Sequence, residues 1–171
     1  MQLAEELRRQ QDRVTVSVVG LDLICGKASL APVDRRELVE LGHFPLYAGE
    51  LQWTGHQVCG HLRDSARIFR QRVEILRSAD APVIAQFNPL AEARVASYGR
   101  LDWARLRSEM IVAQHELYDT VRSCREEELD YVGHWEDGTS VTLKELLEFL
   151  PAHQADHASQ LETIVSRGIR H

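Results

Sequence analysis

The sequence predicts an all-α protein, a four-helix bundle of one domain spanning residues 1–171. Four long segments carry apolar residues at spacings of three and four, the period of an amphipathic helix. Cap and turn residues stand at the ends of these segments. Four such helices in a chain of 171 residues pack most simply as a four-helix bundle. A chain of this length buries roughly 70% of its unfolded surface, so its core needs neither disulfides nor a metal.

The first helix is expected over residues 3–23. Its apolar positions follow a near-helical spacing: Leu3, Leu7, Val14, Val18 and Leu21. The run 14–19 is rich in β-branched residues, so a strand is the alternative there. The connection 27–53 is punctuated by Gly and Pro, and one short helix is expected in it over 34–41.

The second helix begins at a capping box, in which Thr54 and Gln57 each bond the backbone of the other. Its apolar stripe is Val58, Leu62, Ala66, Phe69, Val73 and Leu76, and the helix is expected to end near residues 78–82. A connector over 83–100 follows, with one short helix at 90–97.

Asp102 is a good N-cap for the third helix. The apolar stripe of this helix is Trp103, Leu106, Met110, Ala113, Leu117, Val121 and Cys124. The link 129–140 is expected to be irregular, with a turn at Asp137–Gly138.

The fourth helix opens with a second capping box, Thr142 to Glu145, and ends at Arg167–Gly168. Its inward-facing positions are Leu146, Leu147, Leu150, His153, His157, Leu161 and Ile164. Pro151 removes one backbone hydrogen bond, so a kink is expected one turn before His153.

Charge and composition exclude several classes of function. The net charge is −6, whereas a nucleic-acid-binding protein needs a basic face. No run reaches the ~18 apolar residues of a membrane helix, and the charged N-terminus does not resemble a secretory signal. Cys25, Cys59 and Cys124 are scattered without a C-x-x-C motif, which is typical of free packing thiols in a reducing cytoplasm.

His153 and His157 could hold a metal ion, because residues four apart on a helix lie on one face about 6 Å apart in height. Both lie on the apolar stripe, so they point inward. A solvated helix surface is the alternative, since H-x-x-x-H alone is a weak motif. His61 lies at the edge of the core stripe of the second helix. A single histidine at such a position is usually a boundary residue with its hydrogen bonds satisfied, and not a metal ligand. Asp64, on the same face, could orient His61 or pair with Arg63 or Arg67.

The residues around these histidines resemble the DinB-like superfamily of metal-binding four-helix bundles, which is unrelated to the translesion polymerase of that name. The stretch from Trp53 to Asp64, WTGHQVCGHLRD, is similar to the pattern W-[ST]-x5-[GA]-H-L-x-D. The stretch from His153 to Leu161, HQADHASQL, is similar to H-x3-H-x2-Q-[IL]. Further similar stretches are 72–76, 80–88 and 138–146, so the resemblance covers residues 53–164.

By this resemblance, His61, His153 and His157 hold one divalent metal ion, zinc or nickel, with iron as a further option. Three His ligands leave positions open for water or substrate, as in catalytic rather than structural sites. Relatives include transferases that use mycothiol or bacillithiol and an isomerase of maleylpyruvate. The resemblance therefore implies a metal-dependent enzyme acting on a small molecule, which activates a low-molecular-weight thiol cosubstrate or water.

Two alternatives stay open, a metal-dependent hydrolase and a non-catalytic metal-bound binding or stress-response module. A fourth protein ligand or a sealed site would favour the non-catalytic module. The remaining candidates near the site, His56, His115, His134 and Cys59, are expected at the surface or in packing. Asp156 turns about 100° from His157 and is expected to face solvent.

A homodimer is also expected. Relatives are frequently dimers, and Trp103, Tyr118 and Trp135 are large side chains that a small bundle does not readily bury. Aromatic residues of this kind are enriched in protein interfaces.

Overall fold

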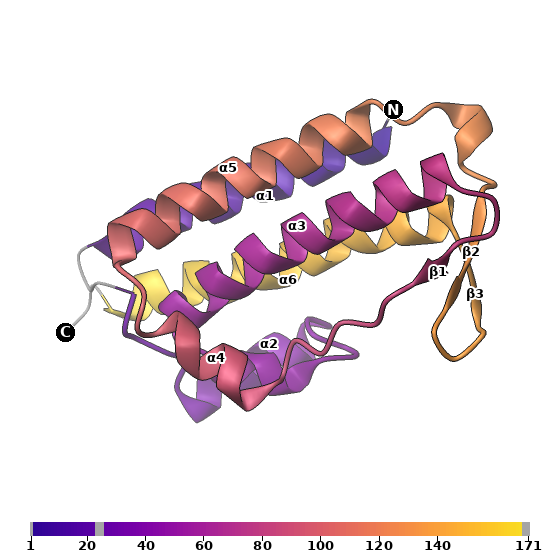
Figure 1. The fold of residues 1–171 in the computed structure, drawn as a ribbon. Helices are drawn as coiled ribbons and strands as arrows, with labels where there is room; N and C mark the ends of the chain where they lie inside the picture. Colours follow the sequence, from indigo (N-terminus) through magenta and orange to yellow (C-terminus); the bar gives the residue numbers. More distant parts are fainter. Residues whose placement is uncertain (1, 23–25, 169–171) are drawn as a thin grey trace.

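The computed structural model describes residues 2–22 and 26–168, and it confirms the all-α four-helix bundle. Figure 1 shows the four long helices in two layers, with α3 packed beside α5 in front and α1 packed beside α6 behind. The four are α1 (Gln2–Leu21), α3 (Gly55–Ser78), α5 (Trp103–Arg122) and α6 (Leu143–Gly168). The first helix therefore forms as predicted, and the strand alternative over 14–19 is wrong.

Helices α3 and α5 run parallel, as do α1 and α6. Ion pairs fix the direction of the first pair, because Arg63 bonds Glu109 at 2.9 Å and Arg70 bonds Glu116 about two helical turns further along both helices. Parallel neighbours need a connection that returns along the whole bundle. The segment 79–102 makes this return on the outside of the bundle (Figure 1), and it carries β1 (Val83–Ile84) and α4 (Glu92–Tyr98).

The link between α5 and α6 is more regular than predicted. After the 3-10 turn η3 (Glu126–Glu128), it forms β2 (Val132–Trp135) and β3 (Ser140–Thr142), an antiparallel hairpin. The predicted turn at Asp137–Gly138 joins these strands, with Gly138 at a φ of 85°. Strand β1 pairs with β2 in parallel, so the sheet order is β1-β2-β3. Strands of two to four residues are too short to show the two-residue alternation that predicts them.

The predicted helix caps form. Thr54 and Gln57 make both hydrogen bonds of the capping box of α3. Asp102 accepts the Arg105 N–H at the start of α5. The Thr142 and Glu145 pair closes the first turn of α6 in the same way as at α3.

The core fills the bundle along its length in two clusters of buried apolar residues. Every predicted stripe position of α3 is buried, and Cys59 and Cys124 are buried free thiols, as predicted. The prediction for Cys25 lies outside the described residues. Helix α6 continues through Pro151 to Gly168. Among residues 2–22 and 26–168, no helix combines the length and apolar character that crossing a membrane requires.

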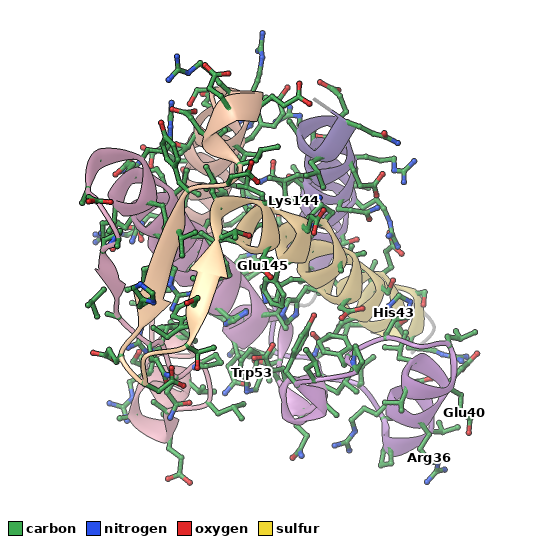
Figure 2. The ribbon with its side chains drawn as sticks, turned by 90° about the vertical axis from the view of Figure 1, so that its right-hand side faces the viewer. Arg36, Glu40, His43, Trp53, Lys144 and Glu145 are labelled. Carbon is green, nitrogen blue, oxygen red and sulfur yellow. The ribbon has the colours of Figure 1, made fainter. Side chains whose placement is uncertain are left out.

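The connection between α1 and α3 lies across the bundle on the α6 side. It contains α2 (Pro32–Glu40) and the 3-10 helix η2 (Ala48–Gln52), so the predicted short helix forms with a slightly earlier start. In Figure 2 this connection passes from His43 alongside α6 to Trp53 at the start of α3. It therefore places η2 over the faces of α3 and α6 that carry the histidines.

Candidate metal centre

The structure brings His61, His153 and His157 together inside the bundle. His61 extends from α3, and the other two extend from neighbouring turns of α6. The Nε2 atoms of His61 and His153 are 3.0 Å apart. All three side chains are buried, with exposed fractions of 3%, 5% and 0% in chain order. The three imidazoles therefore lie together, as predicted.

Glu50 is a fourth member of this cluster, and the sequence analysis missed it. Its Oε2 atom lies 3.1 Å from Nε2 of His157 and 3.8 Å from Nε2 of His61. One candidate donor atom from each of the four residues lies within 4.8 Å of the others. Glu50 comes from η2, a 3-10 turn with no helical stripe to reveal it. Its one sequence signal is its place three residues before Trp53, where the DinB-like pattern begins.

A chain of hydrogen bonds fixes which nitrogen of His157 faces the cluster. The backbone carbonyl of Glu50 can only accept, so the amide nitrogen of Gln160 donates to it at 2.9 Å. Oε1 of Gln160 is thereby turned to Nδ1 of His157, 3.0 Å away, and accepts its proton. A neutral His157 then carries a bare lone pair on Nε2. This lone pair faces the Glu50 carboxylate, and neither atom has a hydrogen-bond partner.

Two buried acceptors facing each other at 3.1 Å need either a proton or a metal ion between them. A metal ion meets this requirement, because neutral imidazole and carboxylate are both metal ligands. Metal–nitrogen bonds near 2.0–2.1 Å in tetrahedral geometry place ligand atoms about 3.3–3.4 Å apart. The separations of 3.0, 3.1 and 3.8 Å bracket that value. The four residues form a possible metal site.

Burial and neighbouring imidazoles favour the unprotonated forms of His61 and His153. Burial lowers the pKa of His61 well below its usual range, and the neighbouring His157 and His153 lower it further. Burial, together with His157, lowers the pKa of His153 in the same way. Neutral imidazoles are the form that binds metal.

Aromatic rings enclose the cluster. The Trp53 ring lies 5.0 Å from His61 and is parallel to His157 at 6.4 Å. Phe44 packs edge-on against His157, with its centroid at 5.2 Å. On the more exposed side, Tyr47 and Phe149 approach His153 at 5.6 and 5.2 Å. These rings lower the local dielectric and hold the imidazoles in place.

Asp156 does not face solvent, contrary to the prediction, and is 7% exposed. Its carboxylate accepts hydrogen bonds from three donors of the α2–η2 loop: Nδ1–H of His43 at 2.8 Å, the Phe44 N–H at 3.1 Å and the Tyr47 O–H at 2.7 Å. The loop covers the side of α6 that a bare helix would present to water. Asp156 thus anchors the segment that carries Phe44 and Tyr47 over the site.

Asp64 does not orient His61. One carboxylate oxygen pairs with Arg63 at 2.8 Å, which is one of the predicted alternatives, and the other accepts the Tyr98 O–H at 2.8 Å. His56, His115 and His134 lie away from the cluster, as predicted. His56 bonds the Leu101 carbonyl, His115 contacts Arg8 and His134 contacts Ser140. Burial raises the pKa of the Cys59 thiol, as expected for a packing residue.

The chain was compared with known proteins, solved structures and protein families. No curated protein matches the chain. Its structure is similar to that of YfiT from Bacillus subtilis, described as "a probable metal-dependent hydrolase with an unusual four-helix bundle topology". The TM-score is 0.69 at 15% identity, over 99% of this chain and 86% of that chain, so the likeness is one of fold. The sequence over residues 4–161 matches the family model of the DinB superfamily, and the chain therefore belongs to the DinB superfamily.

Proposed function

We propose that this protein is a metal-dependent hydrolase acting on a small molecule, with His61, His153 and His157 holding one divalent ion, zinc or nickel. The observation that carries the proposal is Glu50, a buried carboxylate whose Oε2 lies 3.1 Å from Nε2 of His157 without a hydrogen-bond partner. A carboxylate beside a three-His site is placed to accept a proton. The description of YfiT as a probable metal-dependent hydrolase supports this proposal.

A divalent ion bound by the three imidazoles supplies a Lewis acid and lowers the pKa of water. Oε2 of Glu50 takes the proton that the attacking water gives up, and it returns this proton to the leaving group. Gln160 holds Nδ1–H of His157 and also the backbone carbonyl of Glu50, so it orients a ligand and the base together. Trp53 and Phe44 keep bulk water away from these groups.

Activation of a low-molecular-weight thiol is the second candidate, and the DinB-like resemblance favours it. Glu50 favours water over a thiol as the nucleophile. A thiol loses its proton near a pKa of ~8.5, so a metal ion alone suffices to generate the thiolate. The pKa of water is far higher than that of a thiol, so water gains far more from a base beside the ion.

The experiment compares Glu50→Gln with His153→Ala after loading with zinc or nickel. We expect His153→Ala to lose the bound ion. Glu50→Gln should retain the ion while losing hydrolysis of p-nitrophenyl esters by 10²–10⁴-fold, the typical contribution of a general base. Equal metal loss in both variants would instead make Glu50 a fourth ligand and favour a non-catalytic metal-bound module.

Thiol chemistry is tested in parallel on the cobalt-substituted protein. Mycothiol, bacillithiol and glutathione should leave its spectrum unchanged if water is the nucleophile. A sulfur-to-metal charge-transfer band that appears with one thiol and is absent in His61→Ala would move the assignment to thiol transfer.

The homodimer is likewise a proposal. The structure gives each of the three large aromatic residues a partner within the chain: the Trp103 indole donates to Asp22, and Arg side chains lie over the rings of Tyr118 and Trp135. All three rings still remain partly exposed. Light scattering at micromolar concentration should give twice the chain mass of 19.5 kDa, and a 19.5 kDa particle would refute the dimer.

A further inference from the structure

Arg72 is a buried cation without an anion. This α3 residue is 9% exposed, and its Nε atom has no hydrogen-bond partner. Among the described residues it forms no ion pair, whereas most arginines on the bundle surface do. Nη2 donates to the Ala85 carbonyl at 3.0 Å. The guanidinium lies over the rings of Trp135 and Phe69, 4.8 and 5.2 Å from their centroids.

The same guanidinium lines an apolar cavity of about 300 Å³ between α3, α6 and the sheet. The apolar walls are Phe69, Trp135, Val141, Leu146 and Phe149. Glu145 is at the rim, beside the strands at the start of α6 (Figure 2), but its Oε2 accepts from the Thr142 N–H and O–H at 2.8 and 2.9 Å. The Oε2 atom of Glu145 is therefore engaged in capping α6, and no carboxylate of the described residues lies within ion-pair distance of Arg72.

The cavity adjoins the metal centre through one layer of aromatic rings. The Phe69 ring stacks on Phe149 at 5.5 Å, and Phe149 stacks on His153 at 5.2 Å. Arg72 follows His61 by eleven residues, which places both on one face of α3, roughly 16 Å apart along its axis. Because the Arg72 side chain leans back over Phe69, its guanidinium lies nearer to the site than that. Between the guanidinium and the histidines lie the stacked rings of Phe69 and Phe149.

We propose that this cavity binds the carboxylate end of an elongated substrate, whose apolar middle lies along Phe69 and Phe149 and whose reactive end reaches the metal centre. The inference rests on the proposed function for the reactive end only. A carboxylate forms charge-assisted hydrogen bonds with a guanidinium, often two in parallel. Burial lowers the pKa of Arg72, and a bound carboxylate would offset that desolvation.

The test uses 6-phenylhexanoate and the matched neutral compound 6-phenylhexan-1-ol, neither of which contains a hydrolysable bond. Binding is measured by calorimetry and tryptophan fluorescence, since Trp135 is in the wall. The protein is the metal-free His153→Ala variant, so that the carboxylate cannot bind an ion. We expect the acid to bind at least tenfold more tightly than the alcohol. Failure of the metal assignment would leave this preference intact, so the two proposals fail separately.

Arg72→Met should reduce the ratio of the affinity for the acid to the affinity for the alcohol to about one, while the alcohol still binds. Arg72→Lys should keep part of it, because the charge remains without the planar fork. Arg70→Met is the matched control, since Arg70 lies on the outer side of α3 and pairs with Glu116. Equal binding of acid and alcohol, no binding of either at millimolar concentration, or a preference that survives in Arg72→Met would overturn the proposal.

Discussion

Gln160 determines which nitrogen of His157 faces the metal centre. Its Oε1 atom accepts the proton of Nδ1 at 3.0 Å, and its amide nitrogen is held by the Glu50 carbonyl at 2.9 Å. One side chain thus connects η2 to α6 and selects the tautomer whose Nε2 can bind a metal ion. This explains the Gln in the H-x3-H-x2-Q pattern, which spacing alone leaves without a role.

Replacement of Gln160 by Leu should weaken metal binding by 10–100-fold, the usual cost of losing a partner that orients a ligand. Gln154→Leu is the matched control, because Gln154 is also buried on α6 but bonds Gln114. Both variants should lose thermal stability. Competition with a chromogenic chelator should show lower zinc affinity for Gln160→Leu alone, and an equal fall in both would remove the orienting role.

The sequence predicted the long helices and the three histidines because each leaves a local signal. The stripes of α3 and α5 repeat every three or four residues, and the caps at Thr54 and Asp102 are short-range patterns. His153 and His157 are one turn apart, and the DinB-like resemblance joined His61 to them.

Glu50 and Asp156 could not be found in this way. Glu50 reaches the site from an irregular segment whose path depends on tertiary contacts. The prediction that Asp156 faces solvent is wrong because a helical projection of α6 alone does not include the loop that covers it. Residues placed by long-range packing leave no periodic signal in the sequence.

The stability of the metal-free protein should depend on pH through the buried imidazoles. Burial and neighbouring imidazoles lower the pKa of His61 and His153 in the folded state, while the unfolded chain titrates near ~6.5. Below ~6.5 the unfolded state therefore binds more protons. The free energy of unfolding should be constant above this pH and fall as pH decreases through and below it.

Urea unfolding in the presence of a chelator measures this dependence between pH 5 and 8. His61→Gln should flatten the fall. His115→Gln should not, because His115 lies on the exposed side of the bundle, bonded to Arg8. A profile in the wild-type protein that is flat over this range would contradict the argument.

The Asp156 carboxylate should stabilise the folded protein, although it is not one of the candidate metal ligands. The Asp156 carboxylate accepts hydrogen bonds from His43, Phe44 and Tyr47. In Asp156→Asn an amide N–H₂ replaces one of the accepting oxygens, so at least one of these donors loses its acceptor. A buried donor left without an acceptor costs about 1–3 kcal/mol. For a domain of this size the melting temperature should then fall by roughly 2–12 °C.

Asp137→Asn is the control for that comparison, since Asp137 lies in the exposed β2–β3 turn and accepts the Thr139 N–H. Thermal unfolding of both variants should show a much larger loss for Asp156→Asn. Equal losses would mean that the α2–η2 loop does not depend on this carboxylate.

Gly60, directly before His61, should not tolerate a side chain. An ideal Cβ there would lie 2.3 Å from Cγ and 2.4 Å from Cδ1 of Tyr98, which is buried and bonded to Asp64. Gly60→Ala gains about 1 kcal/mol of helix propensity, but displacing a packed ring from α4 costs about 1–3 kcal/mol or more. Net destabilisation is expected in thermal unfolding, together with weaker metal binding because His61 moves with the backbone.

The matched change is Gly49→Ala in η2, where the Cβ would meet Leu90 at 3.7 and 3.8 Å, an ordinary contact. This variant should unfold within a few degrees of the wild-type protein. Introducing Gly60→Ala into a Tyr98→Ala background should cost less than in the wild-type background, because the ring that it displaces is gone. The same cost in both backgrounds would show that the close approach of α4 to α3 does not constrain this position.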